Sequence, residues 1–140
     1  MKTIRHFAML TLVILLVFSS CNKDEGTATT LKSKKDLLTA YPWGYESRKV
    51  NGVVTAIETC QKDDILTFLP AGTYTQSPNG TFCNPNDKLI SGTWTLSSDE
   101  KTIAFDGATI FSILELTSSK LVVYYGTSAN NTEATLIPMK

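Results

Sequence analysis

Histidine is almost absent from this 140-residue chain, and the single one, His6, precedes an apolar N-terminal run. Without an imidazole elsewhere, the Ser-His and Cys-His arrangements of nucleophilic catalysis lack their base, and the commonest metal ligand is missing. The sequence also lacks a phosphate-binding glycine loop and the nucleophile-elbow motif of hydrolases. We therefore expect a protein that is not an enzyme and that holds neither a metal nor a cofactor.

An excess of basic charge is missing too, because 13 Lys and Arg residues balance 13 Asp and Glu residues. Domains that bind nucleic acid usually carry a basic face, so we expect no nucleic-acid partner. The acids Asp63, Asp64 and Asp87 follow two cysteines and could come together if those cysteines pair. Their spacing matches no known calcium loop, so we interpret them as solvated loop residues.

The N-terminus has the three parts of a secretory signal. Lys2 and Arg5 give a positive start, an apolar run extends over 7–18, and Ser19 and Ser20 precede Cys21. The apolar run is too short to cross a bilayer comfortably as a helix. The end of this segment resembles the lipobox of bacterial lipoproteins, with Phe18 where Leu or Val is usual. We predict a signal peptide over 1–20 and a lipid, including palmitate, on Cys21.

Such a protein would be held by its N-terminal lipid in the outer membrane of the cell envelope, facing the periplasm or the cell surface. Removal of 1–20 would leave 11 basic and 13 acidic residues, a net charge of −2. It would also leave only two cysteines beside Cys21, namely Cys60 and Cys83. Export favours a disulfide between them, and two separate buried thiols are the alternative.

The remainder of the chain divides into a tether and one domain. Residues 21–30 are small, polar or charged and predict a flexible lipid tether, and 31–140 have the length of one domain. Ser33 and Asp36 fit a capping box, and Pro42 prevents much continuation. We therefore predict a short helix near residues 33–40.

From Trp43 onward the pattern changes to short strands separated by turn signals such as Asn51-Gly52 and Asp106-Gly107. The clearest strand is 90–97, where Trp94 and Leu96 alternate with polar residues. This pattern is typical of an antiparallel sandwich or barrel with eight or nine strands. The predicted strands, some short enough to merge, are 43–50, 53–59, 65–69, 72–76, 81–84, 90–97, 102–106, 109–116, 121–125 and 132–137.

Large side chains on these strands are candidates for the core or for the lining of a ligand cavity. They are Trp43, Tyr45, Phe68, Tyr74, Trp94, Leu96 and Phe105. Outside 1–20 the chain has one arginine, Arg48, on the first predicted strand. Arg48 could cap the end of a barrel by stacking on an aromatic ring, but we favour an exposed charge.

The order of motifs resembles a lipocalin-like domain found in many short lipoproteins of Gram-negative bacteria. The resemblance covers about residues 31–140 and is most specific in the Cys60 block "C-x-x-D-D-x-L-T-F", joined to Cys83 and to "S-G-T-W" at 91–94. It implies an all-β, up-and-down, lipocalin-like antiparallel barrel of about eight strands, with a bond between Cys60 and Cys83. Gly92-Thr93-Trp94 lies mid-chain, whereas true lipocalins carry their G-x-W on the first strand, so no ligand-binding residue is carried over.

Two functions remain after these exclusions. A lipid-anchored barrel could hold a small apolar or amphipathic ligand, which is the interpretation that we favour. Alternatively, a filled barrel could bind or inhibit another protein of the envelope through its outer surface. A cavity would favour the first interpretation, and an exposed apolar patch would favour the second.

Overall fold

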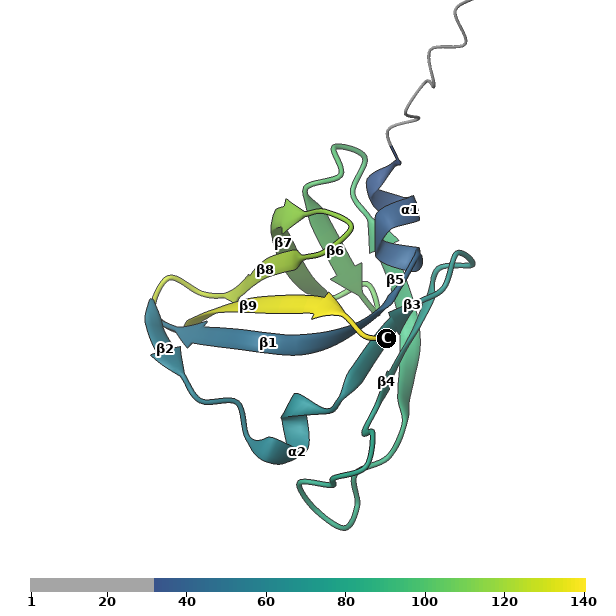
Figure 1. The fold of residues 1–140 in the computed structure, drawn as a ribbon. Helices are drawn as coiled ribbons and strands as arrows, with labels where there is room; N and C mark the ends of the chain where they lie inside the picture. The colour runs from purple at the N-terminus through teal and green to yellow at the C-terminus, as the bar shows by residue number, and fades with distance from the viewer. Residues whose placement is uncertain (1–31) are drawn as a thin grey trace, which may run out of the picture. The chain divides into compact units, whose positions relative to one another are not determined.

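The structure is a computed structural model that describes residues 32–140. The predicted signal peptide, the tether and Cys21 lie outside these residues. These residues form two short helices and nine strands, which are labelled in Figure 1. In chain order they are α1 (Lys34–Thr39), β1 (Pro42–Val50), β2 (Val53–Thr55), α2 (Thr59–Lys62), β3 (Ile65–Phe68), β4 (Thr73–Ser77), β5 (Ile90–Leu96), β6 (Thr102–Phe105), β7 (Thr109–Leu116), β8 (Leu121–Gly126) and β9 (Asn131–Pro138).

The strands form one antiparallel sheet that closes on itself because β1 pairs with β9. The other edge of β1 has two partners: β3 pairs with its first residues and β2 with its last. The closed ring therefore contains eight strands, and β2 is a hairpin extension of β1 outside that ring. The predicted antiparallel up-and-down barrel with a short helix is confirmed.

The helix α1 covers one end of the barrel (Figure 1). Its capping box is formed as predicted, because the Ser33 hydroxyl accepts from the Asp36 backbone and the Asp36 carboxylate accepts from the Ser33 backbone. Leu38 is fully buried, and its carbonyl oxygen accepts a hydrogen bond of 2.9 Å from the indole of Trp43. This bond satisfies the polar atom of a buried tryptophan, as burial requires. Leu38 and Trp43 together therefore seal this end of the core.

The hairpin turns follow from residues that tolerate positive φ. Asn51 and Gly52 have φ of 50° and 80° and connect β1 to β2. Asp106 and Gly107 have φ of 51° and 71° and lie between β6 and β7. Such angles are costly for most side chains but mild for Asn, Asp and Gly. Both turns lie where their sequence signals place them.

Two strand predictions are wrong. Residues 81–84 form no strand and belong to a long loop between β4 and β5. Pro85 lacks a backbone donor, and the carboxylate of Asp87 accepts a bond of 2.9 Å from the backbone of Asn84, so local turn bonds replace a sheet ladder there. The strand predicted over 53–59 ends at Thr55, and the chain then enters the short helix α2.

The core lies between α1 and the middle of the barrel, and aromatic rings dominate it. Phe68 contacts Trp94 edge to face at 5.2 Å between ring centroids, and Tyr74 meets Phe105 in the same way at 4.9 Å. Of the residues proposed from sequence for the core or a ligand cavity, the buried ones are Trp43, Phe68, Tyr74, Trp94 and Phe105, and the half-buried ones are Tyr45 and Leu96. Neither helix within residues 32–140 is long and apolar enough to cross a membrane.

Candidate ligand site at the open end of the barrel

The two ends of the barrel differ, because α1 closes one end and the other holds connected cavities. The first, here called the mouth cavity, has a volume of about 140 Å³. Side chains from β1, β4, β8 and the segment around α2, from Ile57 to Asp64, converge on it. Its lining residues are Tyr45, Arg48, Ile57, Gln61, Asp64, Gln76 and Tyr125. Most of them are polar, in contrast to the apolar core.

Arg48 reaches this cavity because β1 contains an irregularity. The pairing register between β1 and β9 shifts between Tyr45 and Ser47. Before the shift Tyr45 pairs with Leu136, and after it Arg48 pairs with Ala134, which is fully buried. Directly paired residues share a face of the sheet, so Tyr45 and Arg48 both point inward although they are three positions apart. The expectation that Arg48 is an exposed charge is therefore wrong.

The guanidinium of Arg48 is only partly satisfied by neutral groups. Its Nη2 donates to the carbonyl oxygen of Ala56 at 3.0 Å, and its Nη1 donates to the amide oxygen of Gln61 at 3.4 Å. Its Nε is buried and has no hydrogen-bond partner among residues 32–140. The ion pairs formed within the described chain are Lys49–Glu133 and Lys120–Glu115, so Arg48 belongs to neither.

Acid and amide groups lie on another wall of the mouth cavity. The Asp64 carboxylate accepts a weak bond of 3.4 Å from the amide of Gln76. Burial raises the pKa of Asp64, the Gln76 bond partly opposes this, and the nearby charges of Asp63 and Asp87 raise it further. Burial also raises the pKa of Tyr45. At neutral pH Tyr45 thus keeps its hydroxyl proton and can both donate and accept a hydrogen bond.

A disulfide ties the two segments that border the mouth cavity. Cys60 in α2 is bonded to Cys83 in the loop between β4 and β5, with 5.0 Å between their Cα atoms. The predicted pairing is confirmed, and the alternative of two separate thiols is wrong. The carboxylate of Asp63 adds a second tie, because it accepts a bond of 2.9 Å from the backbone of Thr81. Figure 1 shows α2 and this loop at the same side of the barrel.

A second cavity, here called the aromatic lobe, adjoins the mouth cavity and has a volume of about 200 Å³. The two share Tyr45 and Gln76. The other lining residues of the aromatic lobe are Leu66, Tyr74, Phe105, Asp106, Thr109 and Phe111. Phe111 stacks on Tyr125 with 4.4 Å between ring centroids, so aromatic contacts continue from one cavity into the other. A molecule with a polar and an apolar part fits this succession of surfaces.

Beneath both cavities the barrel is packed. A space of about 20 Å³ lies among the apolar side chains there, close to the room of a single water molecule. Ile103, Leu121 and Leu136 fill this level of the described barrel. The open volume of the described barrel therefore lies at its open end and does not run along the whole axis. The barrel combines a filled core with a shallow site, whereas the sequence had left a cavity and a filled barrel as alternatives.

A third space of about 380 Å³ lies beside the disulfide loop and shares Gln61, Asp64 and Gln76 with the mouth cavity. Asp87 lines it as well. Within residues 32–140 no three His, Cys, Asp or Glu side chains gather closely enough to hold a metal ion. The negative charges of Asp63 and Asp87, near the disulfide, contribute to raising the pKa of Asp64.

A known protein family matches much of this barrel. The family model described as a lipocalin-like domain matches residues 38–123, more than half of the chain. The chain belongs to the lipocalin-like domain family. The part matched to the lipocalin-like family includes Arg48, Asp64 and Gln76, whereas Tyr125 and β9 follow it.

Solved structures agree with this assignment at the level of the fold. The chain is similar to a lipocalin-like protein from Bacteroides uniformis ATCC 8492, with a TM-score of 0.53 and 13% sequence identity. The alignment covers 74% of this chain and 99% of that protein. No curated protein matches the chain. These similarities support the lipocalin-like architecture and name no ligand.

Sequence reasoning missed several residues of the site. It proposed Tyr45 and Tyr74, but it did not single out Gln61 or Gln76. Gln76 carried a signal that could have been used: it lies two positions after Tyr74 in a predicted strand, so both point to the same face. A polar residue facing inward at a strand end indicates the rim of a cavity. Gln61 had no such signal, because α2 was not predicted.

Proposed function

We propose that this protein is a lipoprotein of the bacterial cell envelope, anchored in the outer membrane through lipid on Cys21. Its barrel would bind a small amphipathic ligand at the open end. The signal pattern over 1–20 and the cysteine after it support the anchor. The continuity of the polar mouth cavity with the aromatic lobe supports the binding role. Together they favour a carrier or sensor of a small molecule over an enzyme.

The observation that carries the binding role is the convergence of polar groups from separate elements on one hollow. Arg48 comes from β1, Gln61 from α2, and Gln76 from β4. A filled structural core has no need of such groups, because each polar atom costs free energy when it is removed from water. Small-molecule sites combine apolar walls with a few placed polar groups in this manner.

A matched pair of variants tests the binding role. Thr109 lines the aromatic lobe, whereas the adjacent Ile110 is 60% exposed. Thr109→Trp should fill the lobe, and Ile110→Trp should add the same bulk without entering it. Native mass spectrometry of the full chain, isolated from the exporting host in mild detergent, would detect a bound molecule as an adduct that disappears on denaturation.

We expect an adduct on the wild type and on Ile110→Trp and its loss from Thr109→Trp. An adduct of equal abundance on all three proteins would place the bound molecule elsewhere and contradict the proposed site. If no protein carries an adduct and none takes up an added amphipathic probe, the binding role fails.

A second candidate function is an interaction or inhibitor module of the envelope. It is favoured by apolar side chains exposed near the disulfide loop: Phe82 at 57%, Leu89 at 58% and Ile90 at 52%. Exposed apolar residues that lie together often mark a docking surface for another protein. Phe82→Ser and Leu89→Ser separate the two functions, because they should abolish partner binding and leave the small-molecule adduct intact.

A further inference from the structure

Among residues 32–140, Arg48 has no carboxylate within ion-pair distance. Within the described chain its positively charged guanidinium donates to two neutral oxygens, those of Ala56 and Gln61. Its buried Nε has no partner within the described chain. Buried charges in proteins are usually paired, because an unpaired one loses its hydration without compensation. The N–H donors of Arg48 that these two bonds leave unused are therefore available to a group from outside the protein.

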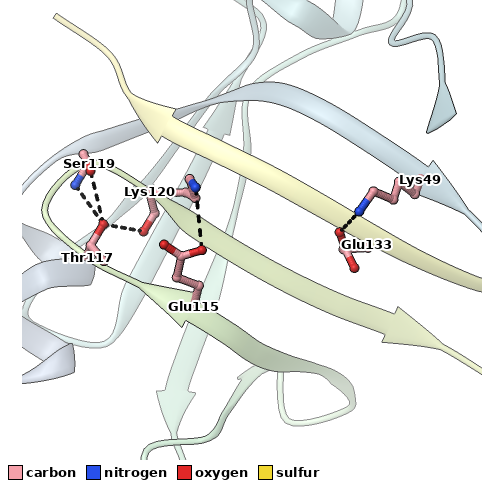
Figure 2. Close-up of polar contacts among 6 residues, drawn as sticks. All are labelled: Lys49, Glu115, Thr117, Ser119, Lys120 and Glu133. Atoms are coloured by element: carbon pink, nitrogen blue, oxygen red, sulfur yellow. Dashed lines mark hydrogen bonds and ion pairs between the residues drawn. The ribbon is translucent and has the colours of Figure 1, made fainter. Parts of the chain in front are cut away.

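The neighbouring residue Lys49 shows the contrast. Lys49 points to the outer face of β1, where it forms an ion pair of 2.6 Å with Glu133 on β9 (Figure 2). The same outer surface carries a second pair, Lys120 with Glu115 at 3.7 Å. The two adjacent cations on β1 thus point to opposite faces of the sheet, and of these two only Lys49 forms an ion pair among residues 32–140. The cation without a carboxylate partner is the one that lines a cavity.

We propose that Arg48 binds the anionic head of the ligand, a carboxylate or another singly charged oxygen group, while the ligand's apolar body occupies the aromatic lobe. This inference rests on the proposed binding function and adds the charge and orientation of the ligand. The planar guanidinium suits such a head, because its donors match two oxygens side by side.

The orientation follows from the residues that the two cavities share. Tyr45 lines both the mouth cavity and the aromatic lobe, so a molecule that extends from Arg48 to Phe111 passes Tyr45. The Tyr45 hydroxyl can donate a second hydrogen bond to an anionic oxygen. In the other direction the packed core prevents a longer tail from descending past Ile103. The ligand is consequently compact, with its head and body side by side at the open end.

Asp64 limits the charge of this ligand. It lines the same cavity as Arg48 and would repel additional negative charge. A singly charged head held by Arg48 tolerates this neighbour better than a polyanion does. Asp64→Asn should therefore strengthen the binding of an anionic probe and leave a neutral probe unaffected, which distinguishes Asp64 from a merely structural residue.

Three probes with the same apolar body test the inference: 4-phenylbutyrate, its neutral amide, and the corresponding ammonium compound. Each is titrated calorimetrically into the full chain in detergent, with titrations into micelles alone subtracted. We expect the carboxylate to bind at least about tenfold more tightly than the amide, as for a hydrogen bond to a charged group. Arg48→Gln should remove this preference, whereas Lys49→Gln, with the same change of charge, should retain it.

The outcomes separate the inference from the function on which it rests. Equal affinity for all three probes, together with loss of binding in Thr109→Trp, would overturn the anionic head and leave the ligand site standing. No binding of any probe to the wild type would overturn the anionic head, and the binding function would fail with it if native mass spectrometry also finds no adduct. If Arg48→Gln does not fold, Arg48→Lys replaces it, because lysine keeps the charge but not the fork. Its preference for the carboxylate should be weaker than in the wild type but present, and an unchanged preference would contradict the fork geometry.

Discussion

The carboxylate of Asp106 lies directly against Gly92, where a Cβ atom would have to be. From there it accepts a bond of 2.8 Å from the backbone of Thr93 and one of 3.0 Å from the hydroxyl of Tyr74. Gly92 pairs with Tyr74 between β5 and β4, so Asp106 connects the turn after β6 to both strands. The absence of a side chain at position 92 is thus a requirement of this contact.

Gly92→Ala is accordingly expected to destabilise the barrel. The added methyl group must displace the Asp106 carboxylate, which then loses its bonds to Thr93 and Tyr74. We expect the free energy of unfolding in urea to fall by about 1–3 kcal/mol, as for an overpacked site. In an Asp106→Ala background the same substitution should cost clearly less, because the obstructing group is gone. Equal costs in both backgrounds would contradict the contact.

The same carboxylate makes stability depend on pH. The backbone bond from Thr93, then the bond from Tyr74, lower the pKa of Asp106 below its ordinary value of 3.8. A group with a lowered pKa stabilises the fold above its unfolded-state pKa, and this contribution is lost as pH falls through the folded-state pKa. Asp106→Asn, which does not titrate, should therefore show a smaller loss of stability on acidification below about pH 4.

Asp36 and Asp99 have lowered pKa values for similar reasons, chiefly their bonds to Ser33 and Ser97. The Asp106→Asn variant should thus keep part of the acid sensitivity. Urea unfolding at a series of pH values measures the difference. A pH dependence identical to that of the wild type would show that Asp106 does not contribute.

Trp94 provides the test of the core. It is 3% exposed, its indole donates to the carbonyl oxygen of Leu69 at 3.1 Å, and its ring meets that of Phe68. Trp94→Ala should lower the free energy of unfolding by about 3–5 kcal/mol. Thr95→Ala is the matched control on the opposite face of β5, and it should change stability by no more than about 0.5 kcal/mol. A small effect at Trp94 would mean that the faces of this strand are misassigned.

Cys21 carries the prediction of a lipid anchor. Growth of the host with labelled palmitate should label the wild-type protein, and Cys21→Ser should lose both the label and stable attachment to membranes. The double variant Cys60→Ser/Cys83→Ser is the control, because it removes the disulfide but not the proposed acylation site. Labelling of Cys21→Ser at the wild-type level would refute the anchor.

Much of the fold could be predicted from local patterns. The alternation around Trp94 identified β5, and Asn51-Gly52 marked the turn after β1. Both signals are local, since they depend on side-chain period and on backbone angles. The strand expected over 81–84 failed because these residues lie in a disulfide-bonded loop in which local turn bonds replace a sheet ladder. A pattern within four residues does not reveal a disulfide to Cys60, which lies 23 positions before Cys83.

The candidate site was harder to predict for a related reason. Strict alternation from Tyr45 would place Arg48 on the opposite face of the strand, where its charge would be exposed. The register shift between Tyr45 and Ser47 reverses this for every later residue of β1. The pairing of Arg48 with Ala134 depends on β9, far away in sequence. The face to which Arg48 points is thus set by the pairing of β1 with β9, which local sequence patterns do not reveal.

The closure of the barrel by β1 and β9 has a consequence for the order of folding. The two strands that complete the ring are the first and last strands within residues 32–140, namely Pro42–Val50 and Asn131–Pro138. Contacts so distant in sequence form slowly, because a long loop must be ordered before they contribute. Until the final strand has been synthesised, β1 and β8 both present unpaired edges that can join to other chains. The synthesis of Asn131–Pro138 thus decides whether the nascent sheet becomes a ring or an aggregate.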